Sequence, residues 1–279
     1  MTASPRAVIR LLATFALCIT ASMQVAAPAA AVGSSTWDGL KTDVFGSRTI
    51  ESGLGVVTIK APFRPEDQRA VPVTIDARLA DGRSVKSVTL IVDENPSPVA
   101  AVFTFGAAKR AVALKTNIRL NQETHVRAIV EASDGRLYMA QQLVKFAGGQ
   151  AACSAPPTGN PEEIAANMGK MRLTSVPGDG AANASSILNR VRLEVSHPNH
   201  TGMALDQQTL LYIPLRMITT LEVSQGGVKL FDMTGSITIS ENPAFEFDVD
   251  LTREHRIVAR LKDSDGTEWS RQLDLPAGS

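Results

Sequence analysis

The side chain of this sequence with the most distinctive chemistry is the thiol of Cys153. The chain has two cysteines, and the other, Cys18, lies in an N-terminal apolar run that we expect to be removed on export. Cys153 would then have no partner within its own chain. An unpaired thiol in an oxidising compartment can carry a covalent adduct, form an intermolecular disulfide, act as a nucleophile or be incidental.

The residues around Cys153 argue against catalysis and favour a tethered thiol. Cysteine nucleophiles are activated by a histidine, a helix N-terminus or a basic neighbour, and the closest charged residue in this strip is Lys145. We therefore expect the pKa of the thiol to stay near the ordinary value of ~8.5. About six flexible residues on the sheet side of Cys153 would give it a reach of roughly 20 Å at full extension. A carrier thiol fits best, with disulfide exchange and an incidental residue as alternatives.

The N-terminal segment has the pattern of a secretory signal peptide. Arg6 and Arg10 precede an apolar run, and a stretch of small residues ends at about Ala31. The apolar run is shorter than the ~20 residues that a membrane-spanning helix needs. We predict a signal peptide over residues 1–31 and a protein that works in the periplasm.

The rest of the chain is long enough for two domains, and its patterns are those of β-strands. Apolar and polar residues alternate over Val73–Leu79, Val191–Ser196 and Phe245–Leu251, which buries one face of each strand. Long helical repeats between such runs are missing. We predict an all-β protein with two antiparallel β-sandwich domains of immunoglobulin type, over residues 32–146 and 188–279.

Two short motifs occur once in each half. Asp134-Gly135 and Asp265-Gly266 lie between β-like runs and predict hairpins, because glycine can take a positive φ. Glu94-Asn95-Pro96 and Glu241-Asn242-Pro243 each precede a pair of phenylalanines. We interpret these repeats as shared sandwich architecture without chemistry of their own.

The segment over residues 147–187 has the composition of a flexible linker. It is rich in Gly, Ala and Pro and contains the carrier cysteine, so it should not bury enough apolar surface to order itself. One island interrupts it, where Asn160 should cap a short helix that begins at Pro161. Ile164, Met168 and Met171 would form the face that docks on a domain.

Composition excludes several functions. The 28 basic and 28 acidic residues cancel, so there is no field to attract nucleic acid. His197, His200 and Asp206 are the best candidates for a metal site, but a satisfied structural role is the stronger interpretation, and we expect no metal and no cofactor. No phosphate-binding loop or nucleophile elbow is present in the sequence. We therefore expect a protein that is not an enzyme.

A family resemblance adds to this interpretation. The segments that carry it in the first half are Trp37, Leu40-Lys41, Val44-Phe45-Gly46, Ile59, Ala61-Pro62, Val71-Pro72-Val73, Val92-Asp93-Glu94-Asn95-Pro96-Ser97-Pro98 and Val126-Arg127-Ala128. Those in the second half are His197-Pro198, Thr201-Gly202, Ile213-Pro214 and Ser240-Glu241-Asn242-Pro243. The first half resembles the sulfur carrier SoxY of bacterial thiosulfate oxidation, and the second resembles its partner SoxZ. The whole looks like a fused SoxYZ-like carrier of the kind associated with quinoprotein dehydrogenases.

The resemblance implies a carrier role for Cys153, with Gly148 and Gly149 as its flexible tether. In separate SoxY proteins a cysteine in a terminal Gly-Gly-Cys-Gly-Gly tail carries sulfur intermediates between partner enzymes. Here Gln150, Ala151 and Ala152 separate the glycines from the cysteine, and the cysteine is internal to the chain, which puts thiosulfate as the cargo in doubt. The resemblance implies a periplasmic carrier that presents a sulfur intermediate on Cys153 to sulfur-oxidation or quinoprotein oxidoreductases. The alternative is an immunoglobulin-like binding or assembly accessory of a quinoprotein dehydrogenase that does not use its thiol.

Overall fold

The computed structural model describes residues 34–146, 148–176, 188–250 and 252–275. The predicted signal peptide and Cys18 lie outside these residues. The first half contains α1 (Ser34–Phe45), β1 (Ile50–Ser52), β2 (Val57–Lys60), β3 (Val71–Arg78), β4 (Val85–Val92), β5 (Val99–Lys109), β6 (Ala111–Ile118), β7 (Thr124–Ala132) and β8 (Leu137–Val144). The second half contains η1 (Ala152–Ser154), α2 (Pro161–Asn167), β9 (Met171–Ser175), β10 (Leu188–Val195), β11 (Ile218–Gln225), β12 (Val228–Gly235), β13 (Ala244–Asp250), β14 (Arg256–Asp263) and β15 (Glu268–Asp274).

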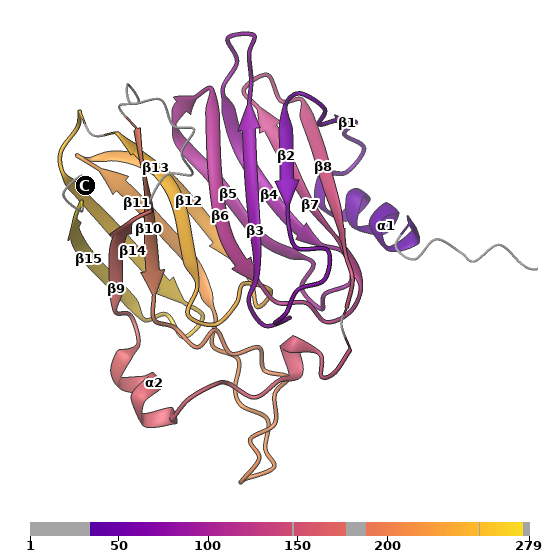
Figure 1. Cartoon of the computed structure of the whole chain (residues 1–279), viewed down its shortest axis with the longest axis vertical. Coiled ribbons are helices and arrows are strands. Elements are labelled where there is room, and N and C mark those ends of the chain that lie inside the picture. Colours follow the sequence, from indigo (N-terminus) through magenta and orange to yellow (C-terminus); the bar gives the residue numbers. More distant parts are fainter. Residues whose placement is uncertain (1–33, 147, 177–187, 251, 276–279) are drawn as a thin grey trace, which may run out of the picture. The chain divides into compact units, whose positions relative to one another are not determined.

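The strands form two β-sheets that face each other (Figure 1). One sheet has the order β1-β8-β7-β4-β5-β12-β11-β14-β15, and the other has the order β2-β3-β6-β13-β10-β9. Neighbouring strands are antiparallel in every described pair but β1 and β8, which run parallel. The prediction of an all-β protein with two immunoglobulin-like sandwich domains is confirmed.

The two domains join edge to edge, which the sequence did not lead us to expect. β5 pairs with β12 from Ala101↔Gly235 to Thr104↔Asp232, and β6 meets β13 at Lys115↔Glu246. Phe103 of the first half makes edge-to-face contacts with Phe231 and Phe245 of the second, with ring centroids 5.8 and 6.4 Å apart. Buried residues of both halves form one core. Pairing these edges removes two rows of open backbone groups that an isolated sandwich would expose.

The local patterns explain why these segments are strands. Along β3, buried positions alternate with exposed or half-buried ones, as the period of two requires. Gly135, between β7 and β8, and Gly266, between β14 and β15, have φ of 85° and 79°. Both predicted hairpin turns are therefore confirmed.

The segment over residues 147–187 is more ordered than a flexible linker where the structure describes it. Asn160 caps α2, its side chain accepting a hydrogen bond from the Glu162 N–H at 2.8 Å, as predicted. Ile164 and Met168 are half-buried, but Met171 belongs to the next strand. β9 pairs with β10 and packs partly buried side chains on the core. This part of the segment is ordered because β9 covers an edge of β10 that would otherwise be open. Residues 147 and 177–187 lie outside the described part.

Helix α1 covers the outer face of β4, β7 and β8. Its Trp37, Leu40 and Phe45 pack with apolar side chains of these strands. The Arg127 guanidinium lies 4.2 Å from the centroid of the Trp37 ring, a cation–π contact. None of the helices in the described ranges is long and apolar enough to cross a membrane.

Candidate functional site around Cys153

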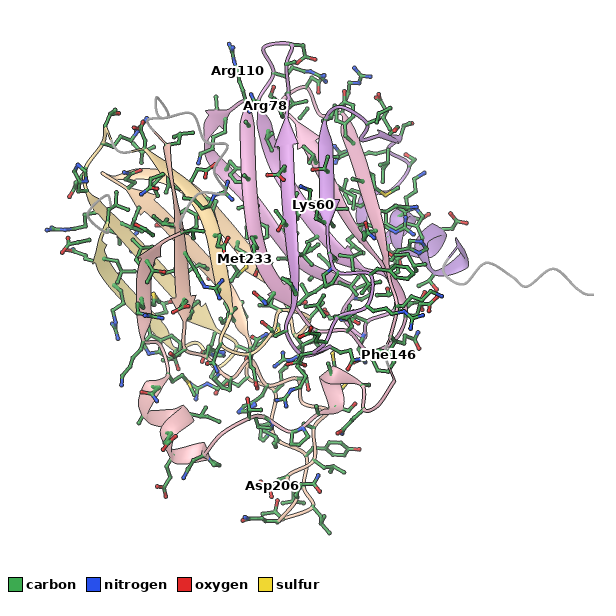
Figure 2. The ribbon with its side chains drawn as sticks, viewed as in Figure 1. Lys60, Arg78, Arg110, Phe146, Asp206 and Met233 are labelled. Carbon is green, nitrogen blue, oxygen red and sulfur yellow. The ribbon has the colours of Figure 1, made fainter. Side chains whose placement is uncertain are left out.

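Cys153 lies in the short η1 turn at one end of the sandwich, on the boundary between the two halves. Figure 2 shows this end through its labels Phe146 and Asp206, with Arg78 and Arg110 at the opposite end. Cys153 is 0% exposed to solvent. The expectation of an exposed thiol on a mobile tether is therefore wrong for this conformation of the chain.

The backbone of Cys153 is held by one side chain from each half. Its N–H donates to Oδ1 of Asn121 at 2.9 Å, and its carbonyl accepts from the Thr201 hydroxyl at 2.5 Å. The preceding Ala152 N–H donates to the Leu120 carbonyl at 3.2 Å. Asn121 and Thr201 thus form a clamp that fixes the turn, and we call them the clamp residues.

The repeated Glu-Asn-Pro motifs support this clamp. Asn95 is buried, its Oδ1 accepts from the Asn121 N–H at 3.1 Å, and its Nδ2 donates to the Arg119 carbonyl at 2.7 Å. In the second half, Oδ1 of Asn242 accepts from the N–H of His197, near the loop that carries Thr201. Our interpretation of the motifs as architecture is incomplete, because they also position the residues around the thiol.

Arg119 places a positive charge beside the thiol. Its side chain donates hydrogen bonds to four backbone carbonyls of the second half, those of Pro198, Asn199, Ile237 and Ile239. Burial lowers its pKa, while Cys153 and Glu241 act to raise it. A buried guanidinium bonded only to neutral carbonyls favours an anion nearby.

Burial also controls the thiol itself. It raises the pKa of Cys153 well above its ordinary value, to about 11, and the attraction of Arg119 opposes the rise only in part. The expectation of a pKa near the ordinary value is therefore wrong in this conformation. At neutral pH the docked thiol is protonated and a poor nucleophile.

The space beside the turn is small. A cavity of about 10 Å³ is lined by Ala152 and Ala155 of the cysteine segment, Arg69 and Arg119 of the first half, and His200 of the second. That is room for about one water-sized group. Cys153 itself is not among the residues that line this cavity, and its side chain is fully buried.

Gly148 and Gly149, the glycines of the expected tether, have a backbone conformation that favours glycine. Gly148 and Gly149 both have φ of 93° and are exposed. Side chains other than glycine rarely adopt this backbone conformation. Rotation at these two residues could move the turn without breaking β8.

The loop that carries Thr201 presents apolar side chains to solvent. It folds back on itself over residues 200–216 through bridges between His200 and Arg216 and between Leu205 and Tyr212. Leu210 and Tyr212 are 73% and 67% exposed. We call residues 200–216 the apolar loop. A groove of about 640 Å³ lies between this loop and α2.

The histidines considered as metal ligands have structural roles. His197 is buried, its Nδ1 accepts from the Asn199 N–H at 3.0 Å, and its Nε2 lies 3.6 Å from Asp263 Oδ2. Burial lowers the pKa of His197 to about 4. Asp206 instead accepts the N–H groups of Gln208 and Thr209. In the described part of the chain, no group of three or more His, Cys, Asp or Glu side chains is arranged to hold a metal ion.

Sequence reasoning identified Cys153 but missed the residues that control it. Arg119, Asn121 and Thr201 are far from Cys153 in the sequence, and only folding brings them to the turn. Thr201 was noted for the family resemblance alone. The strongest available signal was the repeated Glu-Asn-Pro motif, whose first asparagine contacts the clamp.

Comparisons with known proteins match the two halves separately. The family model of the sulfur oxidation protein SoxY matches residues 41–151, and that of the sulphur oxidation protein SoxZ matches residues 180–274. Among solved structures, the sulfur carrier protein SoxY from Chlorobium limicola f thiosulfatophilum is 26% identical, with a TM-score of 0.33, over 41% of this chain and 98% of that one. The superoxide reductase neelaredoxin from Ignicoccus hospitalis is 18% identical, with a TM-score of 0.27, over 33% and 80%. A search of curated proteins finds no match.

Proposed function

Since the chain belongs to the SoxYZ-like proteins, with a SoxY domain and a SoxZ domain in one chain, we propose that it is a periplasmic, non-enzymatic carrier of sulfur intermediates. Cys153 is the attachment point. The observation that carries this proposal is the position of Cys153 directly after the SoxY match, in a turn clamped between the two domains and next to the buried Arg119.

Loading joins the sulfur of Cys153 to a sulfur atom of a reduced inorganic compound. The new S–S bond requires the loss of two electrons and of the thiol proton. A periplasmic oxidoreductase, of the sulfur-oxidation or quinoprotein class, accepts the electrons. This carrier supplies no oxidant and acts as the substrate of its partners.

The buried position of Cys153 gives the carrier a closed state and an open state. In the closed state the thiol is protonated and shielded, which protects it from oxidation and from wrong partners. In the open state the turn leaves the clamp by rotation about Gly148 and Gly149, and the pKa of the thiol returns toward its ordinary value. Opening breaks the two side-chain hydrogen bonds to the Cys153 backbone, at about 1 kcal/mol each, breaks the bond from the Ala152 N–H to the Leu120 carbonyl, and exposes the buried thiol.

The charge of Arg119 favours an anionic sulfur group on Cys153 near the closed position. A persulfide adds one sulfur atom to the fully buried thiol, whereas a sulfonate-bearing adduct adds several atoms and would hold the turn open. The size of the adduct would therefore shift the balance between the two states. A loaded carrier with a large adduct would be the form that partners capture.

Burial of the thiol also favours a second candidate function. An accessory that binds a quinoprotein dehydrogenase would use surfaces such as the apolar loop and would keep Cys153 as a core residue. The two functions differ in whether the protein still works when the sulfur atom of Cys153 is replaced by oxygen in Cys153→Ser.

Complementation tests the carrier proposal. Cells that lack this chain receive the wild type, Cys153→Ser or the neighbouring control Ser154→Ala, and oxygen uptake driven by reduced sulfur compounds is measured. We expect Ser154→Ala to restore uptake and Cys153→Ser to fail while folding normally by circular dichroism. Full restoration by Cys153→Ser would favour the accessory function.

A further inference from the structure

A second cavity lies between the two domains, far from the cysteine turn. It has a volume of about 320 Å³ and takes its walls from β5 and β6 of the first domain and from β12 and β13 of the second. Arg110, one of its lining residues, lies at the end of the sandwich opposite the apolar loop (Figure 2). The cavity is therefore separate from the site of the proposed carrier chemistry.

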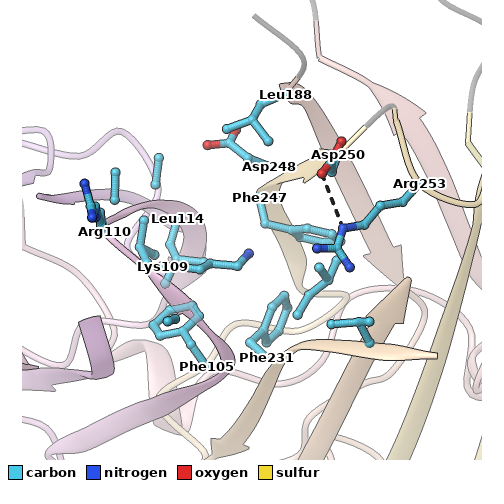
Figure 3. A pocket seen from close by; sticks show the side chains of 16 residues that line it. Phe105, Lys109, Arg110, Leu114, Leu188, Phe231, Phe247, Asp248, Asp250 and Arg253 are labelled. Atoms are coloured by element: carbon cyan, nitrogen blue, oxygen red, sulfur yellow. Dashed lines mark hydrogen bonds and ion pairs between the residues drawn. The ribbon is translucent and has the colours of Figure 1, made fainter. Parts of the chain in front are cut away.

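The walls of this cavity are mainly apolar and aromatic. Phe105, Phe231 and Phe247 line it, together with Leu114 and Leu230 (Figure 3). Phe231 and Phe247 are in edge-to-face contact, with ring centroids 5.2 Å apart. The volume is at the small end of the range of ligand sites, ≈ 300–1,000 Å³. A small apolar body fits between these rings.

Lys109 introduces a charge into this apolar space. Its half-buried side chain extends into the cavity, as Figure 3 shows. Its ammonium group makes no hydrogen bond or ion pair with any residue that the structure describes. Burial lowers its pKa, and the charge of Asp248 opposes this lowering only in part.

The carboxylates at the rim of the cavity are already paired. Asp248 Oδ1 accepts from Arg190 Nε at 2.6 Å, and Asp250 Oδ2 lies 3.3 Å from Arg253 Nε. Among the described residues, Lys109 and Arg110 are the cations of this cavity without a hydrogen bond or ion pair, and Lys109 is half-buried whereas Arg110 is exposed. No carboxylate of the described residues forms an ion pair with Lys109, and an apolar wall lies next to its ammonium group.

We propose that this cavity binds a small amphipathic monoanion, a carboxylate with an apolar tail. The carboxylate binds Lys109, and the tail packs against the phenylalanine rings. Because residues of both domains form the walls, the ligand would bridge the domains and stabilise their junction. This binding activity is additional to the proposed sulfur carrier function and uses none of its residues.

Sodium decanoate and decan-1-ol, which share one tail and differ in charge, test the proposal on the full mature chain. Isothermal titration at neutral pH compares the wild type with Lys109→Met, Lys109→Arg and the control Lys60→Met, an exposed lysine on β2. We expect saturable binding of decanoate at one site, and a loss of about 10- to 100-fold in affinity for Lys109→Met. Lys109→Arg and Lys60→Met should bind nearly as well as the wild type, and binding of decanol should change little in any variant.

Methyl NMR of the wild type locates the ligand independently of the variants. Shifts on addition of decanoate should concentrate at Val112, Leu114 and Leu230, which line the cavity. Absence of saturable binding, shifts confined to other parts of the chain, or equal affinities for Lys109→Met and Lys60→Met would each overturn the proposal. Cys153→Ser should bind decanoate normally, so failure here is distinct from failure of the carrier function.

Discussion

The reactivity of Cys153 should be controlled by the clamp residues Asn121 and Thr201. Asn121→Ala removes the acceptor of the Cys153 N–H, and Thr201→Val removes the donor to its carbonyl while keeping the side-chain shape. Each change should weaken the closed state by about 1 kcal/mol. The population of the open turn should then rise about 5-fold in each variant and about 30-fold in the double variant.

The low reactivity of the buried thiol sets the largest rate increase that opening the turn can produce. Because burial raises the pKa of Cys153 to about 11, its thiolate is at least ~100-fold scarcer at neutral pH than that of an ordinary thiol. Wild-type protein should therefore react with a neutral aromatic disulfide at least about 100-fold more slowly than the same protein in urea. The single variants Asn121→Ala and Thr201→Val should each react faster than folded wild-type protein, and the double variant should react faster still.

Stopped-flow absorbance of the released aromatic thiol measures these rates. Thr219→Val is the matched control, because Thr219 also donates its hydroxyl to a backbone carbonyl, that of Lys262, but on β11. The reasoning is refuted if folded wild-type protein reacts as fast as unfolded protein. It is also refuted if Asn121→Ala and Thr201→Val react no faster than Thr219→Val.

Three further predictions concern the surroundings of the thiol. Arg119→Met should lower the free energy of unfolding by about 2–4 kcal/mol in urea titrations, because four backbone carbonyls lose a hydrogen bond from the guanidinium. An unchanged midpoint would contradict this. The pKa of His197 falls from 6.5 to about 4 on folding, so the unfolded chain binds a proton that the folded chain does not. The contribution of His197 to the free energy of unfolding should therefore be fully present above pH ~7. The free energy of unfolding should decline by at most about 3 kcal/mol as the pH drops through 6.5 toward 4. The variant His197→Gln should show a smaller decline. Leu210→Ser with Leu211→Ser should leave the melting temperature within the error of wild type, because both side chains are exposed, yet reduce sulfur-dependent oxygen uptake; equal uptake would remove the apolar loop from partner binding.

Much of the fold follows from local patterns. The alternation in β3, β10 and β13 predicts strands because the two faces of a half-buried strand differ in polarity. Asp-Gly pairs predict hairpins, and Asn160 with Pro161 predicts the start of α2, because these signals depend on neighbouring residues alone.

The junction of the domains could not be predicted in this way. An edge strand has the same alternation whether its outer edge faces water or pairs with another strand, so β5 and β12 gave no sign of their pairing. The order of residues 148–176 follows from that arrangement, since β9 and η1 are held by partners from elsewhere in the chain.

Only part of the candidate site could be predicted, because its residues too are brought together by folding from distant parts of the sequence. Cys153 is found by counting, as the single cysteine outside the predicted signal peptide. Its backbone position, however, is fixed by Asn121 and Thr201, which are 32 and 48 residues away in the sequence. The pKa of a thiol depends on its folded surroundings, so composition around Cys153 suggested mobility where the fold supplies a clamp.

The most direct test of the carrier claim is mass spectrometry of the peptide that contains Cys153. The protein is taken from the periplasm of cells grown on a reduced sulfur compound, alkylated and digested without reductant. The carrier account predicts a fraction of this peptide with additional sulfur on Cys153, removed by reductant and lost in Cys153→Ser. A plain thiol or a simple dimer disulfide under every growth condition would contradict it.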